Sequence, residues 1–196
     1  GIGTTRKDVA VAIDALNKDR KEKLKHKSTV RMYLDILSED YLNITELIHI
    51  REIYDALTSG EIEDEDQLDG ELFRKDLVSI VNNKTGKIEH IAPSKEQTIK
   101  EMLKSWLDFI NTETIPFLIK ASLAHYFFEN VHPFYDGNGR TGRYILSKSL
   151  SRKLDKFSGL IISKKINEDK AKYYKSFAET GDTLNRADGT QFVQSM

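Results

Sequence analysis

Apolar residues recur along most of the chain at intervals of three and four positions, the spacing typical of amphipathic helices. This spacing predicts helices over about residues 5–23, 28–37, 45–58, 96–111, 115–130, 141–153 and 168–178, and the start of another over 190–196. Residues 115–130 are apolar on almost every side, so we expect this segment to be the central and most buried helix.

Two short runs rich in β-branched residues interrupt the helical pattern. They cover 77–81 and 87–91 and flank a polar segment that contains Gly86, an arrangement typical of a β-hairpin. Pro93 then ends the second run. The pattern as a whole predicts an all-α fold, a helical bundle with one small β-hairpin.

The chain length of 196 residues fits a single domain with a small addition. We divide it into an N-terminal helical annex over 1–44 and a main domain over 45–196, which we expect to be truncated at both ends. Hydrophobic residues make up 39% of the chain, enough to bury a core.

The composition excludes several kinds of site and partner. The chain has no cysteine, which excludes disulfides, cysteine-ligated zinc, iron–sulfur clusters and thiol nucleophiles. The net charge of -1 argues against nucleic acid as the main partner. No apolar run approaches the length of a membrane span, so we expect a cytoplasmic protein with no membrane partner.

Residues 61–71 are strongly acidic, with seven carboxylates. A metal site is one interpretation of this segment, but the acids lack the spacing of metal ligands. We therefore predict an acidic loop.

The segment from His132 to Arg143 concentrates chemistry that the rest of the chain lacks. Its glycines allow main-chain N–H groups to converge on an anion, and the helix that follows adds its own unpaired N–H groups. Arg140 and Arg143 share one face of that helix and can grip phosphate oxygens. Asp136 is a ligand that suits Mg²⁺, and His132 can accept a proton at neutral pH.

These residues predict a site for Mg²⁺ with a nucleotide or polyphosphate, equipped with a general base. The segment lacks the Gly-Lys-Ser/Thr ending of a P-loop, and no Gly-x-Gly-x-x-Gly follows a strand, which excludes the common nucleotide folds. Each residue alone could equally be structural. Their convergence in twelve positions favours a functional site.

The segment 132–143 resembles the signature of the Fic family, His-x-Phe-x-(Asp/Glu)-Gly-Asn-Gly-Arg-x-x-Arg, at every specified position. The predicted bundle and hairpin agree with this family, as does the Phe73-Arg74 pair that precedes the hairpin. The resemblance covers about residues 47–178. It implies a transferase that moves AMP from ATP to a hydroxyl side chain of a target protein and releases pyrophosphate.

The resemblance also implies roles for individual residues. His132 would deprotonate the target Ser, Thr or Tyr, Phe134 would anchor the loop in the core, and Asp136 would hold Mg²⁺ against the phosphates. Asn138, with the amides of Gly137 and Gly139, would neutralise charge on the α-phosphate.

The remaining implied contacts concern ATP and the target protein. Arg140 would bind the β-phosphate and Arg143 the γ-phosphate, while Tyr173 and Tyr174 would lie near the adenine. The hairpin at 77–91 would act as a flap that docks the target by strand addition, although a simple structural hairpin explains the same pattern. Gly139 is a glycine here, which favours AMP transfer over phosphorylation.

Many Fic proteins also carry an inhibitory motif, Ser/Thr-x-x-x-Glu-Gly/Asn, whose Glu pairs with the second signature arginine. The near match in this chain, Ser59 to Glu63, is followed by Asp64 and lies in the acidic segment. We expect instead that the motif precedes Gly1.

Two other functions share these residues. One is an ATP-sensing regulatory or toxin–antitoxin binding module with little transfer activity, which the complete signature disfavours. The other is a Fic-type hydrolase that removes AMP. The sequence leaves the target protein and the oligomeric state open, a homo-oligomer included.

Overall fold

The computed structural model describes residues 27–38, 43–81, 88–186 and 188–196, together with the isolated positions 7, 10, 11, 13 and 86. The helix predicted over 5–23 therefore lies largely outside the described residues, and so does most of the hairpin loop.

Helices dominate the described part of the chain, as the sequence predicts, and the all-α fold with a small hairpin is confirmed. The longer helices are α2 (Lys27–Leu37), α3 (Leu47–Thr58), α4 (Glu96–Asn111), α5 (Phe117–Val131), α6 (Asn138–Lys153), α7 (Lys156–Glu168) and α8 (Lys170–Gly181). The shorter elements are η1 (Asp64–Asp66), β1 (Ser79–Val81), β2 (Ile88–Ile91), η2 (Thr183–Asn185) and α9 (Thr190–Ser195).

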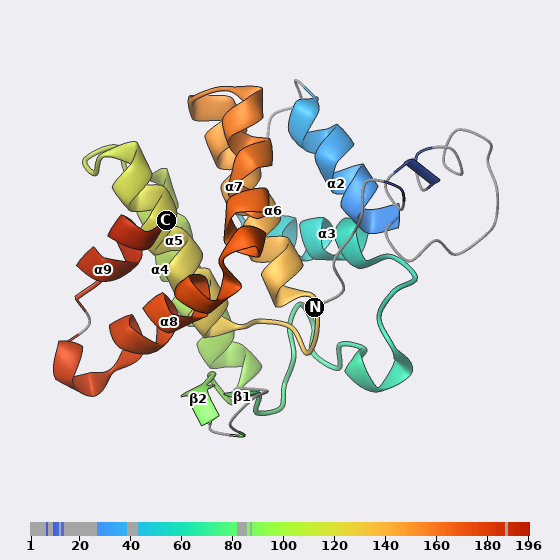
Figure 1. Cartoon of the computed structure of the whole chain (residues 1–196). Coiled ribbons are helices and arrows are strands. Elements are labelled where there is room, and N and C mark those ends of the chain that lie inside the picture. Colours follow the sequence, from blue (N-terminus) through green and yellow to red (C-terminus); the bar gives the residue numbers. More distant parts are fainter. Residues whose placement is uncertain are drawn as a thin grey trace.

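Helices α4 to α7 each pack against the next helix along the chain. Figure 1 shows α5 between α4 and α6, and α7 lying along α6. Helices α2 and α3 cover further parts of α6, while α8 and α9 pack together and α9 contacts α5. The segment 132–143, where the sequence predicts the site, forms the connection between α5 and α6 and the start of α6.

Apolar faces of α2 to α6 meet in one core, which excludes water from large aromatic and aliphatic side chains. The Trp106 indole N–H donates to the Ala124 carbonyl at 2.8 Å, which ties α4 to α5 inside this core. Met32 and Ile36 of α2 belong to the same core, although they lie in the predicted annex. The annex boundary at residue 44 stays a prediction.

Helix α6 differs from the prediction in both its start and its burial. It begins at Asn138, three residues before the predicted start, because Gly137 alone turns the chain with a φ of 83°. The expectation that 115–130 is the most buried helix is wrong, since α6 has nine buried residues and α5 has five. Four neighbouring helices cover α6, whereas the first turn of α5 exposes Leu118 and Ile119.

Helix α7 is absent from the sequence prediction. Its helical pattern is weak because Phe157 and Ile161 are exposed and Gly159 lies on the side packed against α6. A Cβ at Gly159 would lie only 2.5 Å from the Ser147 carbonyl oxygen, so glycine permits the close approach of the two helices.

The strands β1 and β2 form a two-stranded antiparallel sheet that pairs Ser79 with Ile91 and Ile80 with His90. The register shifts between Ile80 and Val81. No helix in the described ranges is long and apolar enough to cross a membrane.

Candidate functional site

His132 lies where α5 ends, in the left-handed conformation with φ 50° and ψ 60°. Its Nδ1 atom is 3.1 Å from the Glu129 carbonyl oxygen. A carbonyl oxygen only accepts hydrogen bonds, so in the neutral ring Nδ1 carries the proton and Nε2 keeps its lone pair. Burial lowers the pKa of His132 to about 4, and the positive charge of Arg74 adds to this effect. The ring is therefore neutral at pH 7 and can accept a proton at Nε2.

Phe134 anchors the loop in the core, as predicted. Its side chain is fully buried and stacks on Tyr54 with ring centroids 3.8 Å apart. The Asn138 amide bonds both backbone groups of Phe134, at 2.9 Å to its N–H and 2.7 Å to its carbonyl. The Asn138 side chain thus holds the loop in shape, and its oxygen and nitrogen both point into the loop.

The loop turns into α6 at Gly137, and the turn leaves no space for a side chain. A Cβ at Gly137 would lie 2.9 Å from Thr58 Cγ2, and its positive φ is strained for other residues. The first turn of α6 then contains Asn138, Gly139 and Arg140. A helix has no intrahelical partners for its first N–H groups, so this turn presents donors and a positive dipole end to an anion.

Arg140 reaches back across the loop to two carboxylates. Its Nη1 atom is 2.6 Å from Glu61 Oε2, and Nη2 is 3.5 Å from Asp136 Oδ2. The Asp136 side chain is 57% exposed. Mg²⁺ is commonly held by one or two carboxylates together with nucleotide phosphates. An exposed carboxylate beside an anion-binding turn fits Mg²⁺ that arrives with a nucleotide.

The described residues contain no group of three or more His, Asp or Glu that could hold a metal ion by itself. Besides Glu61, two carboxylates of the acidic segment contact other residues. Asp69 accepts from the Lys75 N–H and the Tyr135 hydroxyl, and Glu71 pairs with Lys100. The prediction of an acidic loop agrees with the irregular backbone on both sides of η1, and the absence of a metal site there stays a prediction.

Arg143 lies above a buried polar cluster that the sequence does not reveal. The cluster consists of His125, Glu129 and Tyr173. Its guanidinium lies next to Gly139, where a Cβ would come within 2.7 Å of Nη1. Beneath it is Glu129, whose Oε1 atom is buried next to Gly142. Burial raises the pKa of Glu129 to about 7, and the positive charge of Arg143 opposes this rise.

Of the two tyrosines predicted near the adenine, Tyr173 is buried and Tyr174 is 54% exposed. The Tyr173 hydroxyl is 2.8 Å from His125 Nε2, so it belongs to the cluster beneath Arg143. A contact between either ring and adenine stays a prediction.

Arg74 is the residue that holds the loop and the hairpin together, a role that the sequence does not show. Its side chain is fully buried and donates to four carbonyl oxygens: those of Val131 at the end of α5 and His132 in the loop, and those of Asp76 and Pro93 at the two ends of the hairpin. The bond from Nε to the His132 carbonyl is 2.7 Å long. A buried arginine that binds carbonyls has no sequence signal apart from the Phe73-Arg74 pair itself.

The hairpin lies close to the loop, as a flap over this site must. His90 of β2 has its Nε2 atom 2.7 Å from the Asn130 carbonyl, two residues before His132. Val81, Ile88 and Ile91 expose apolar side chains on the hairpin. Glu63, the acid of the near match to an inhibitory motif, is exposed at the start of η1.

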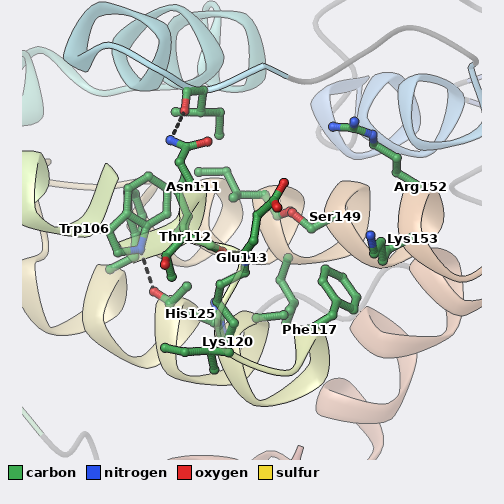
Figure 2. A pocket seen from close by; sticks show the side chains of 18 of the residues that line it. Trp106, Asn111, Thr112, Glu113, Phe117, Lys120, His125, Ser149, Arg152 and Lys153 are labelled. Atoms are coloured by element: carbon green, nitrogen blue, oxygen red, sulfur yellow. Dashed lines mark hydrogen bonds between the residues drawn. The ribbon is translucent and has the colours of Figure 1, made fainter. Parts of the chain in front are cut away.

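A hollow lies apart from the loop. It is a cavity of about 790 Å³ between the end of α4, the start of α5 and the second half of α6. Figure 2 shows Trp106 and Asn111 on one side, and Ser149, Arg152 and Lys153 on the other. Gly142 is the only residue of 132–143 in its wall, so this cavity and the loop are separate features.

Comparisons with known proteins point to one family. The Fic/DOC family model matches residues 40–150, more than half of the chain. The chain is 36% identical over 100 residues to "Protein adenylyltransferase fic-1" of Caenorhabditis elegans, and 31% identical over 121 residues to "Protein adenylyltransferase Fic" of Drosophila melanogaster. These matches cover 48% and 60% of this chain but only 19% and 22% of the two relatives. The chain therefore spans about a fifth of the length of these curated relatives.

A solved structure supports the same fold. The Fic family protein from Desulfovibrio desulfuricans G20 aligns with a TM-score of 0.73 at 23% identity, over 97% of this chain and 55% of that one.

Proposed function

Because the chain belongs to the Fic/DOC family, we propose that it is a protein adenylyltransferase, which transfers AMP from ATP to a Ser, Thr or Tyr hydroxyl of a target protein. The observation that carries this proposal is the pairing, in one loop, of a neutral histidine with a helix start that presents N–H donors and two arginines. Phosphoryl-type transfers depend on positioning and charge stabilisation, and this loop offers both.

In the proposed reaction, the target hydroxyl oxygen attacks the α-phosphorus of ATP. The bond from the α-phosphorus to the bridging oxygen breaks, and pyrophosphate leaves with that oxygen. The hydroxyl proton moves to Nε2 of His132, which the Glu129 carbonyl orients through Nδ1.

The other residues stabilise the phosphates. The N–H groups of the first turn of α6 face the α-phosphate, while Arg140 and Arg143 bind the β- and γ-phosphates. Asp136 would hold Mg²⁺, which neutralises phosphate charge when it is bound. The target would add a strand to the hairpin, whose tie to Asn130 keeps it beside His132.

Incubation with ATP labelled at the α-phosphate and, separately, at the γ-phosphate tests this proposal. We expect protein-bound label from the first nucleotide only. Label from γ-labelled ATP would indicate phosphorylation. No retained label, with ATP still bound, would favour the ATP-sensing function, and release of AMP from a modified protein would favour the hydrolase.

A further inference from the structure

The segment that follows α3 is built to reach the start of α6. Gly60, with a φ of 73°, reverses the chain directly after α3, and the Glu61 N–H donates to the Thr58 carbonyl at 2.9 Å. One turn earlier, Thr58 and Tyr54 contact the site loop at Gly137 and Phe134. Glu61 thus extends from a part of the fold that is already fixed against the loop.

Glu61 makes a shorter contact with Arg140 than Asp136 does. Oε2 of Glu61 is 2.6 Å from Nη1, and both side chains are about three-quarters buried, with 25% and 28% exposed. Partial burial reduces screening by salt, so such a pair is better ordered than a fully exposed one. Asp136 contacts the other end of the guanidinium at 3.5 Å.

We propose that Glu61 is a positioning residue that orients Arg140 toward the β-phosphate of the bound nucleotide. This inference rests on the proposed function and adds a residue to it. A guanidinium is a planar fork of five N–H donors, so a carboxylate held close to Nη1 fixes the plane in which the group meets a phosphate. A long arginine side chain loses conformational freedom on binding, and Glu61 reduces that loss by ordering the side chain beforehand.

The pair of Glu61 and Arg140 predicts that the effect of Glu61 on nucleotide affinity depends on the number of phosphates. AMP lacks a β-phosphate, whereas ADP and ATP both carry one. A contact that acts through Arg140 should therefore affect the binding of ADP and ATP and leave the binding of AMP unchanged. A purely structural disturbance of the site would weaken the binding of all three nucleotides.

The test measures the dissociation constants of AMP, ADP and ATP by calorimetry with Mg²⁺ present, for the wild-type chain and for Glu61→Ala. We expect Glu61→Ala to raise the constants for ADP and ATP about tenfold and to change that for AMP less than twofold. Glu61→Gln keeps the length of the side chain and an accepting oxygen, so its effect should be intermediate. Glu63→Ala is the matched control, because Glu63 is exposed in the same segment. This variant should bind all three nucleotides as the wild type does.

A double-mutant cycle shows whether Glu61 acts through Arg140. The Glu61→Ala, Arg140→Ala double variant should bind ADP no more weakly than Arg140→Ala alone. Additive losses would overturn the inference, as would equal losses for AMP and ADP. Tighter ATP binding by Glu61→Ala would make Glu61 an inhibitory contact instead. A wild-type chain that binds no ATP would overturn the proposed function itself, and the inference with it.

Discussion

His132 combines two features that suit it for accepting a proton. Its surroundings lower its pKa to about 4, so it is neutral at pH 7, and its Nδ1 contact leaves the lone pair on Nε2. Neither feature involves the nucleotide. In the proposed reaction the base therefore acts on the target protein, while the helix start and the arginines would act on ATP.

His132→Ala should abolish transfer while leaving the ATP dissociation constant within about threefold of the wild-type value. The loss should appear in kcat, as measured by label transfer from α-labelled ATP, with calorimetry reporting ATP binding. A comparable loss of ATP affinity would show that His132 binds the nucleotide and would contradict its role as the base.

Asp136→Ala should remove the Mg²⁺ dependence of ATP binding, because Asp136 is the exposed carboxylate beside the anion-binding turn. Stability should change little, since surface substitutions of this kind are usually within about 0.5 kcal/mol. Calorimetric titrations with ATP, with and without Mg²⁺, measure the effect. An unchanged Mg²⁺ dependence in the variant would refute the assignment of the metal to Asp136.

At the scale of elements, the segment before the hairpin depends on one side chain of α4. The Glu96 carboxylate accepts from the backbone N–H groups of Glu71, Leu72 and Phe73, at 2.7 to 3.1 Å. Although partial burial opposes ionisation, these bonds lower the pKa of Glu96 to about 2. This anchor precedes Arg74, which holds the loop and the hairpin.

Glu96→Ala should lower the free energy of unfolding by about 1.5–3 kcal/mol, because each N–H loses a bond to a charged acceptor. Urea unfolding at pH 7 measures this change, and Glu101→Ala, an exposed acid on the same helix, is the control. The contribution should be present above the ordinary pKa of 4.5 and should disappear as the pH falls through about 2. Equal stability of the two variants would contradict the anchoring role.

The helices show which parts of the fold a sequence can predict. The range 96–111 matches α4 because its apolar stripe is regular, with Ile99, Leu103 and Trp106 buried at helical spacing. The start of α6 was predicted too late, because Gly-Asn-Gly is typical of a turn while Gly137 alone makes this one. Helix α7 was missed because Gly159 serves a close packing contact, which only the neighbouring helix reveals.

At the scale of the whole molecule, the candidate site combines three segments that are separated in sequence. They are the segment after α3 with Glu61, the segment before the hairpin with Arg74, and the end of α5 with the loop. The sequence predicted the loop 132–143 because its chemistry is local. Glu61, Arg74 and Glu129 were not assigned roles at the site, since each acts through contacts that depend on the packing of α3, the hairpin and α5 around the loop. Long-range pairs of this kind leave no pattern in a single sequence.

The buried histidine beneath the site makes the stability of the whole chain depend on pH. Burial lowers the pKa of His125 from 6.5 to about 3, and the positive charge of Arg143 adds to this shift. Between these two values the unfolded chain binds a proton that the native chain does not. This group therefore contributes full stability above pH 6.5, and its contribution falls with the pH toward 3.

As the pH falls from 6 to 4, the free energy of unfolding of the wild-type chain should decrease by about 1.4 kcal/mol per pH unit more than that of His125→Gln. Urea unfolding of both proteins at several pH values measures this difference. The comparison isolates His125, because both proteins share all other titrating groups. Parallel stability curves would show that His125 is not held neutral.

Tandem mass spectrometry of a protein substrate, after incubation with ATP and Mg²⁺, is the measurement that tests the central claim most directly. The chain itself serves as that substrate if its own hydroxyls are modified. The account predicts AMP linked through its phosphorus to a Ser, Thr or Tyr oxygen when the wild-type chain is present, and no adduct with His132→Ala. A phosphate adduct, or the same AMP adduct with His132→Ala, would contradict it.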